Sequence, residues 1–244
     1  MTANNLVSYE RAEHIAKITL QRPEKLNAFN RKLVKDLHHA WVQFEQDDEA
    51  RVAIITGEGK HFSAGLDIND FTPVSPAIPG TGAEVTKPII AALNGYCIGI
   101  GLVVAFMSDI RICTEDAQFI YPEAKIGYTG GVGSLLANVI PQGIALEMLL
   151  VGEGISAKRA YEVGLVNHIV PKEQLMDEAL NMARKIANNA PLVVQALKKF
   201  ARDTSLMEKA GIGNRIIGQL TESKDRSEGF AAFSEKRSPH FTGK

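Results

Sequence analysis

The sequence predicts an α/β fold followed by a mainly helical C-terminal region, and three patterns carry this prediction. In the first half, short apolar runs typical of β-strands alternate with a segment of helical periodicity. A cluster of proline and glycine residues then interrupts the alternation before two more apolar runs. Beyond Gly131, apolar residues recur mainly at helical spacing, with capping and turn residues between the runs.

Four segments of the first half are predicted strands, at residues 15–20, 52–56, 89–93 and 110–113. Each is a short run rich in isoleucine, valine and other apolar residues, as expected for strands buried in a sheet. Between the first two runs, a helix is predicted from the apolar residues that repeat every three or four positions: Leu33, Leu37, Trp41 and Phe44.

Residues 67–87 are predicted to form a surface loop, because they concentrate residues that break regular structure: Pro73, Pro76, Pro79, Gly80 and Gly82. Two interpretations of this loop stay open. It is either a plain linker or a wall of a neighbouring binding pocket, since loops beside sites often shape them.

The C-terminal part is predicted to contain several helices. Ser156 is placed to cap one helix and Gly164 to end it, and Pro171 opens another. The inward positions of this second helix are Leu175, Ala179, Met182 and Ile186. From Pro191 to Phe233 an amphipathic pattern predicts a terminal helical region that needs a partner surface, so we divide the chain into a core, 1–190, and a helical region, 191–244.

Composition limits the possible functions. The 244 residues are 45% hydrophobic and carry 27 basic and 28 acidic side chains, so no strong overall field attracts nucleic acid or an anionic membrane. The N-terminus lacks an apolar signal core, and the longest apolar run, residues 97–107, is shorter than a bilayer span. Cys97 and Cys113 lie in apolar runs typical of buried free thiols, and we therefore expect a cytoplasmic protein.

Several common site motifs are absent or incomplete. The sequence GGVGSLL at 130–136 lacks the glycine spacing and the preceding strand of a dinucleotide-binding loop, and the six histidines show no metal-ligand spacing. Ser63 has no identifiable base, so a structural role is favoured, and Asp67 is interpreted as capping a turn after Gly65. No metal is expected.

Two glycine-containing segments predict a site for a developing oxyanion. HFSAGLDI, at 61–68, and NGYCIGIG, at 94–101, place small residues where the chain turns toward a helix. The backbone N–H groups of Leu66 and Ile100 can then be left unpaired and directed outward. Two such donors that converge would stabilise charge on a carbonyl oxygen, and the start of a helix after Gly99 would add a favourable dipole.

Six segments, in order and spacing, resemble the enoyl-CoA hydratase/isomerase (crotonase) superfamily. They are RPEKLNAFN, HFSAGLDI, KPIIAALNGYCIGIG, SDIRICTEDAQFIYPEAKIG, ISAKRAYEVGLVNHIV and EGFAAFSEKR. The resemblance implies an α/β crotonase-like spiral of ββα units with a helical C-terminal region, assembled as a homotrimer or hexamer. It also implies an acyl-CoA substrate, so that coenzyme A is part of the substrate and no separate cofactor is required.

The resemblance also implies residues that bind CoA. Residues expected near its nucleotide are Lys25, Leu26 and Ala28, and those expected along the adenine and pantetheine channel are Ala64, Leu66 and Ile68. Phe233 and Lys236 are similar to tail residues that reach CoA from the same or a neighbouring subunit.

The family comparison singles out the carboxylates. Family hydratases carry two glutamates, whereas this chain has Val103 at the first position and retains Glu123 at the second. One glutamate suffices to remove a proton beside the thioester and return it two carbons away, so a Δ3,Δ2-enoyl-CoA isomerase is the preferred interpretation.

Two alternatives to isomerisation stay open. One is hydration of an enoyl-CoA by Glu123 with another polar side chain, for which Tyr128, Tyr96 and Asp70 are candidates. The other is a non-catalytic CoA-binding protein. An RNA-binding role is disfavoured because the sequence has no long basic stripe.

Overall fold

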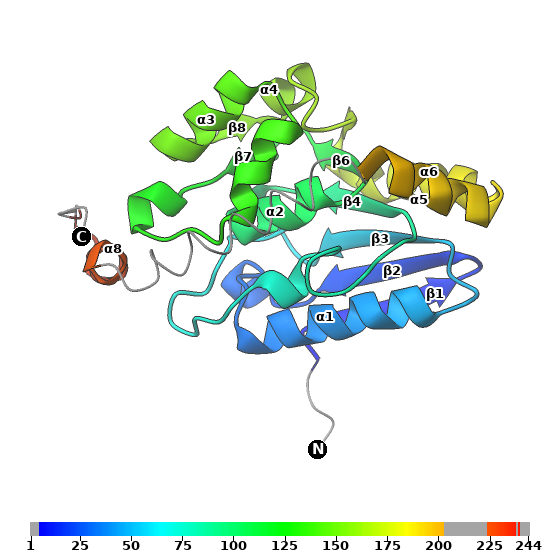
Figure 1. Cartoon of the computed structure of the whole chain (residues 1–244), viewed down its shortest axis with the longest axis horizontal. Helices are drawn as coiled ribbons and strands as arrows, with labels where there is room; N and C mark the ends of the chain where they lie inside the picture. Colours follow the sequence, from blue (N-terminus) through cyan, green and yellow to red (C-terminus); the bar gives the residue numbers. More distant parts are fainter. Residues whose placement is uncertain (1–4, 203–223, 238, 240–244) are drawn as a thin grey trace.

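Two β-sheets form the framework of the computed structural model, which describes residues 5–202, 224–237 and 239 (Figure 1). The strands are β1 (Val7–Ala12), β2 (Ile15–Leu20), β3 (Val52–Gly57), β4 (Ile89–Leu93), β5 (Tyr96–Ile98), β6 (Ile110–Thr114), β7 (Gln118–Ile120), β8 (Ile155–Ser156) and β9 (His168–Val170). The larger sheet has the order β1-β2-β3-β4-β6-β9 and is parallel except for β1. The smaller has the order β5-β7-β8.

Helices follow or separate the strands. The α-helices are α1 (Arg31–Gln46), α2 (Ile100–Met107), α3 (Gln142–Val151), α4 (Ala157–Glu162), α5 (Leu175–Ala187), α6 (Pro191–Arg202) and α8 (Lys224–Ser234). Short 3-10 helices are η1 (Pro23–Lys25), η2 (Ser75–Ala77), η3 (Glu123–Ile126), η4 (Val132–Asn138) and η5 (Lys172–Gln174). The pairs β4–β5 and β6–β7 each pass from the larger to the smaller sheet and are followed by helices, which gives the ββα order expected from the sequence.

The central strands are apolar throughout because both faces of the larger sheet are covered. Alternate residues of β3 point to opposite faces. Ala53 and Ile55 join the main core, which includes Trp41 of α1, whereas Ile54 joins a second core with Ala179 of α5. The sequences of such buried parallel strands are therefore continuous apolar runs and do not alternate between apolar and polar residues.

Helix α1 holds the proline-rich loop against the core. Asn30 caps the helix by accepting a hydrogen bond from the Leu33 amide at 2.9 Å. The buried Trp41 indole donates to the Ala77 carbonyl at 2.9 Å, and Ala77 belongs to η2 within residues 67–87. The middle of the proline-rich loop is thus attached to α1.

The predicted elements largely agree with the structure. β2 and β4 have the predicted bounds, and β3 and β6 each extend one residue further. Ser156 caps α4 through the Arg159 amide, and Gly164, at φ +78°, follows the helix. On α5, Leu175 and Ala179 are buried, and Met182 and Ile186 pack partly buried against the same core, as predicted; Ala183 and Ala187 are buried there as well.

Several short elements carry no clear sequence signal. Strand β1 is an edge strand with mostly exposed or half-buried residues, so its sequence, VSYERA, lacks a strong apolar alternation. Strands β5, β7, β8 and β9 have only two or three residues, which is too short for a period to be recognised. Cys97 and Cys113 are buried free thiols, as predicted.

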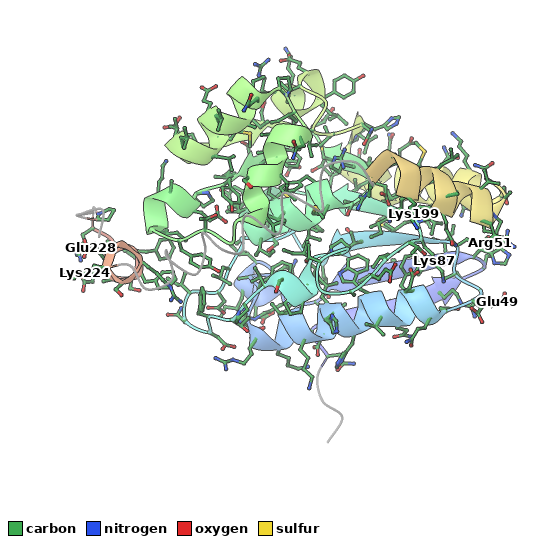
Figure 2. All side chains as sticks on the ribbon, in the orientation of Figure 1. Glu49, Arg51, Lys87, Lys199, Lys224 and Glu228 are labelled. Carbon is green, nitrogen blue, oxygen red and sulfur yellow. The ribbon has the colours of Figure 1, made fainter. Side chains whose placement is uncertain are left out.

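The described parts of the C-terminal region lie at opposite ends of the molecule. Lys198 and Arg202 of α6 pair with Asp109 at 2.9 and 2.7 Å, beside the larger sheet. Figure 2 shows Lys199 of this helix far from Lys224 and Glu228 of α8. A domain boundary at residue 190 stays a prediction. No helix of the described ranges combines the length and apolarity that a bilayer crossing requires.

A buried asparagine fixes the loop between β2 and α1. Asn27 has no exposed surface and adopts a left-handed backbone conformation, φ +55°, which asparagine tolerates well. Its side chain accepts from the Arg22 amide at 2.9 Å and donates to the Glu58 and His61 carbonyls at 3.0 and 2.8 Å. The loop that carries Lys25 is therefore held from inside.

Replacing Asn27 with Ala should destabilise the protein by about 3 kcal/mol, because buried polar groups lose partners and alanine disfavours this backbone conformation. Urea unfolding would measure the change. Asn181→Ala, at an exposed position on α5, is the control and should change stability by less than about 0.5 kcal/mol. Equal stability of the two variants would contradict this role of Asn27.

Candidate active site

A cavity of about 460 Å³ lies where five segments meet. Its walls come from residues 64–68, from the proline-rich loop with η2, from the start of α2, from residues 121–133 and from α8 with the residues that follow it. Most of the lining side chains are apolar. The proline-rich loop supplies Pro73, Val74, Ser75 and Ile78, so the structure favours the wall interpretation of this loop over a plain linker.

Two chain segments run side by side into this cavity. Ser63 bridges Cys97 in parallel register: the Ser63 amide donates to the Tyr96 carbonyl at 2.9 Å, and the Ile98 amide donates to the Ser63 carbonyl at 3.0 Å. Three residues beyond each bridge partner lie Leu66 and Ile100, and both line the cavity.

The amides of Leu66 and Ile100 have no acceptor among the described residues. Ile100 is the first residue of α2, where backbone N–H groups have no partner within the helix. The parallel register and the shared cavity together make these amides a pair of available hydrogen-bond donors. Such donors can stabilise a negatively charged oxygen, and the positive end of the α2 dipole acts in the same direction.

Two glycines allow the close approach of these segments. Gly65 has φ +94°, and a Cβ there would lie 3.2 Å from the Ile98 carbonyl oxygen. Gly99 has φ +53°, and a Cβ there would lie 2.7 Å from Oε1 of Glu123. A side chain at position 99 would therefore displace the carboxyl group from the start of α2.

Glu123 is a buried acid at the start of η3. Its Oε2 atom is buried and has no hydrogen-bond partner among the described residues. Burial raises the pKa of Glu123 from 4.5 to about 8, although a backbone hydrogen bond opposes the shift. A carboxyl group with a pKa near the working pH can both accept and donate a proton.

Val103 occupies the cavity wall one turn after Ile100 on α2. It is buried and apolar. Among the described residues that line the cavity, Glu123 is the only carboxylic acid. The cavity therefore offers one proton-transferring carboxyl group beside the two amides.

Ser63 and Asp67 hold the site together from outside the cavity. The Ser63 hydroxyl donates to the Asn27 carbonyl at 2.9 Å and accepts from the Gly65 amide at 3.1 Å. Asp67 pairs with Arg22 at 2.7 Å and accepts from the Asn69 amide. Burial alone would raise the pKa of Asp67, but these hydrogen bonds outweigh it and lower the pKa, so this carboxylate is ionised.

The other predicted site residues divide into two groups. Those that line the cavity are Ala64, Ile68, Gly99 and Phe233, whereas Lys25, Leu26, Ala28 and Lys236 lie outside its lining. Leu26 is nevertheless close, because its carbonyl accepts from the Ala64 amide at 2.9 Å. Lys236 is followed by Arg237, which does line the cavity.

The three residues considered as the second polar group for hydration differ in whether they line the cavity. Tyr128 lines the cavity. Tyr96 does not line the cavity; this residue is 40% exposed, and its ring stacks on His61 at 4.4 Å between centroids. Asp70 pairs with Arg31 at 3.3 Å, away from the cavity lining.

Sequence reasoning missed the contact that places α8 at the cavity. Gly229 lies so close to η3 that a Cβ would approach the Ile126 carbonyl oxygen at 1.9 Å. A similar contact involves Gly133, where a Cβ would collide with the hydroxyl of Tyr121. Both glycines belong to motifs in the sequence, but only the folded chain shows which backbone or side chain they approach.

Comparison with known proteins identifies the fold. A carnitinyl-CoA hydratase from Mycobacterium avium superposes with a TM-score of 0.90 and 33% identity, and the match covers 99% of this chain and 100% of that one. An enoyl-CoA hydratase/isomerase from Pseudoalteromonas atlantica gives a TM-score of 0.89 and 29% identity, with 97% and 100% covered. The chain has the crotonase fold. In this chain, two backbone amides and one acid face the same cavity.

The sequence comparisons identify the family. Residues 10–244 match the family described as enoyl-CoA hydratase/isomerase. An (E)-benzylidenesuccinyl-CoA hydratase from Thauera aromatica is 38% identical, with 97% of this chain and 99% of that one covered. A carnitinyl-CoA dehydratase from Salmonella paratyphi A is also 38% identical, with 94% and 95% covered. The chain belongs to the enoyl-CoA hydratase/isomerase family and is an enzyme acting on CoA thioesters.

Glu123→Gln should stabilise the protein at alkaline pH. Because folding raises the pKa of Glu123 from 4.5 to about 8, the wild-type protein loses stability as pH rises through this interval. Glutamine does not ionise, so the variant should be more stable by about 3–5 kcal/mol at pH 8.5, and the difference should shrink toward pH 4.5. Thermal unfolding across this range would measure it; a difference that does not change with pH would contradict the burial argument.

Gly229→Ala should weaken acyl-CoA binding. The added methyl group would collide with the backbone of η3, so α8 would move and open one wall of the cavity. We expect the dissociation constant of an acyl-CoA to rise about tenfold, corresponding to about 1.4 kcal/mol. Calorimetric titration would measure it. Gly143→Ala on α3, where a Cβ meets nothing within 4 Å, is the matched control and should bind normally.

Proposed function

We propose that this enzyme shifts the double bond of a 3-enoyl-CoA to the 2-position, with Glu123 carrying the proton. The observation that supports this proposal is the single carboxyl group in the cavity, beside two available backbone amides. Isomerisation needs only one group that takes and then returns a proton. The apolar walls favour an acyl chain over water around that group.

The proton balance of this reaction is simple. The Glu123 carboxylate removes a proton from C2 of the thioester, and the C–H electrons form the C1–C2 double bond of a dienolate. The amides of Leu66 and Ile100 donate to the charged thioester oxygen. Glu123 then returns the same proton to C4, and the double bond moves from C3–C4 to C2–C3. No net proton is gained or lost.

Hydration is the second candidate function. It is favoured by the names of the similar proteins from Thauera aromatica and Salmonella paratyphi A, a hydratase and a dehydratase. Water addition to a 2-enoyl-CoA also passes through an enolate, so it would use the same amides and Glu123. It requires in addition a group that positions the water.

We further propose that the enzyme assembles as a homotrimer or hexamer. Helix α6 exposes large apolar side chains, with Leu192, Val193 and Leu197 79%, 57% and 62% exposed. Apolar surface of this kind favours burial against another protein surface. Light scattering would give the mass of the assembly.

The isomerase proposal predicts that most of the product carries no deuterium from the solvent and that the reaction depends on one acid. Incubation of a 3-enoyl-CoA in deuterated water should yield the 2-enoyl-CoA, and Glu123→Gln should lower kcat/KM by at least about 10³-fold. Nuclear magnetic resonance would follow the product and its label. Isomerisation at an unchanged rate in the variant would remove Glu123 from the mechanism.

The pH dependence of isomerisation should report on the same group. Because the reaction starts with a carboxylate, kcat/KM should rise with pH and level off above the pKa of Glu123, near 8. Initial rates between pH 6 and 9.5 would measure this. A rate that falls over this interval would mean that the protonated acid starts the reaction.

A further inference from the structure

The side chain of Tyr128 enters the same cavity as Glu123 because the chain folds back on itself. The 3-10 helix η3 ends at Ile126 and is followed by Gly127, which has φ +66°. The Tyr128 amide donates to the Glu123 carbonyl at 3.1 Å. Both residues line the cavity, so a phenol and a carboxyl group face one substrate space.

The Tyr128 ring is held by contacts from two distant parts of the chain. Phe71 of the proline-rich loop packs edge-on, with centroids 5.1 Å apart, and Phe230 of α8 lies 6.4 Å away. The Arg226 guanidinium lies 5.7 Å from the ring centroid. Although Tyr128 is on a loop, its ring is therefore packed and its orientation is defined.

The Tyr128 hydroxyl has no hydrogen-bond partner within the described part of the protein. The neighbouring Tyr121 hydroxyl differs, because it bonds to Thr129 at 3.1 Å. Burial raises the pKa of Tyr128, the Arg226 charge opposes this and the Glu123 charge reinforces it. At neutral pH the group is thus a phenol that can donate one hydrogen bond and accept another.

We propose that the Tyr128 hydroxyl positions an oxygen atom at C3 of the acyl group, and that this gives the enzyme a hydratase activity beside isomerisation. Tyr128 would then supply the polar group that the cavity lacks at Val103. The inference rests on the proposed use of Glu123 and the two amides, and it adds the residue that decides whether the substrate space accepts water.

The atoms of this step balance with one carboxyl group. The Tyr128 oxygen accepts a hydrogen bond from one O–H of the water, and Glu123 takes the other proton as the water oxygen bonds to C3. The C2–C3 π electrons move to form the enolate, whose oxygen is held by Leu66 and Ile100. Glu123 delivers its proton to C2. In the reverse direction Glu123 removes the proton from C2 and gives it to the departing hydroxyl oxygen, while the Tyr128 oxygen accepts from the O–H of that hydroxyl.

Tyr128→Phe tests this role because it keeps the ring and removes only the hydroxyl. Hydration of a 2-enoyl-CoA should fall at least 100-fold, and the ratio of hydration to isomerisation of a 3-enoyl-CoA should fall at least 30-fold. Retained isomerisation in the same preparation shows that the cavity is intact. Tyr96→Phe, the same change outside the cavity, is the matched control and should leave both rates unchanged.

Each other outcome has a distinct meaning. Hydration at the wild-type rate in Tyr128→Phe, or no hydration by the wild-type enzyme, overturns the role of Tyr128 and leaves the isomerase proposal intact. An equal loss of both activities shows that the hydroxyl only supports the fold, which also overturns it. Hydration that depends on Tyr128, with no isomerisation by the wild-type enzyme, supports the inference and overturns the isomerase proposal.

Discussion

The pairing of residues 62–63 with residues 94–98 is the constraint on which the site depends. This short parallel contact sets Leu66 and Ile100 at equal distances along the chain from the Ser63–Cys97 bridge. Glycine at position 99 then allows the Glu123 carboxyl group to approach the start of α2. One register of two backbone segments thus brings the Leu66 and Ile100 amides and the Glu123 carboxyl group to one cavity.

The surrounding fold supplies rigidity to this contact. The larger sheet, buried on both faces, fixes the ends of β3 and β4 from which the two segments continue. Asn27, Ser63 and Arg22 tie the loop before α1 to the same region through hydrogen bonds to backbone atoms. The desolvation that raises the Glu123 pKa costs stability, and the packed framework offsets that cost.

The sequence predicted the elements whose signal is local. The face of α1 and the runs of β2 and β4 follow from side-chain periodicity. Motifs placed Leu66, Ile100 and Glu123 at one site, and all three line one cavity, while their catalytic roles stay predictions. Positions that depend on distant contacts were not predictable. Nothing near Tyr128 in the chain shows that Phe71 and Phe230 enclose its ring, and nothing near Gly229 shows that it meets η3. Lys25 and Lys236 lie outside the cavity lining, and their contact with CoA stays a prediction.

The attachment of α8 to η3 has a consequence for biosynthesis. The cavity combines residues from position 64 onward with Gly229, Ala232 and Phe233, which leave the ribosome late. A nascent chain that has completed both sheets still lacks one wall of this cavity. Translation products ending before residue 224 would keep Glu123, Leu66 and Ile100 but lack the wall that α8 supplies, so the cavity is completed after the framework has been made.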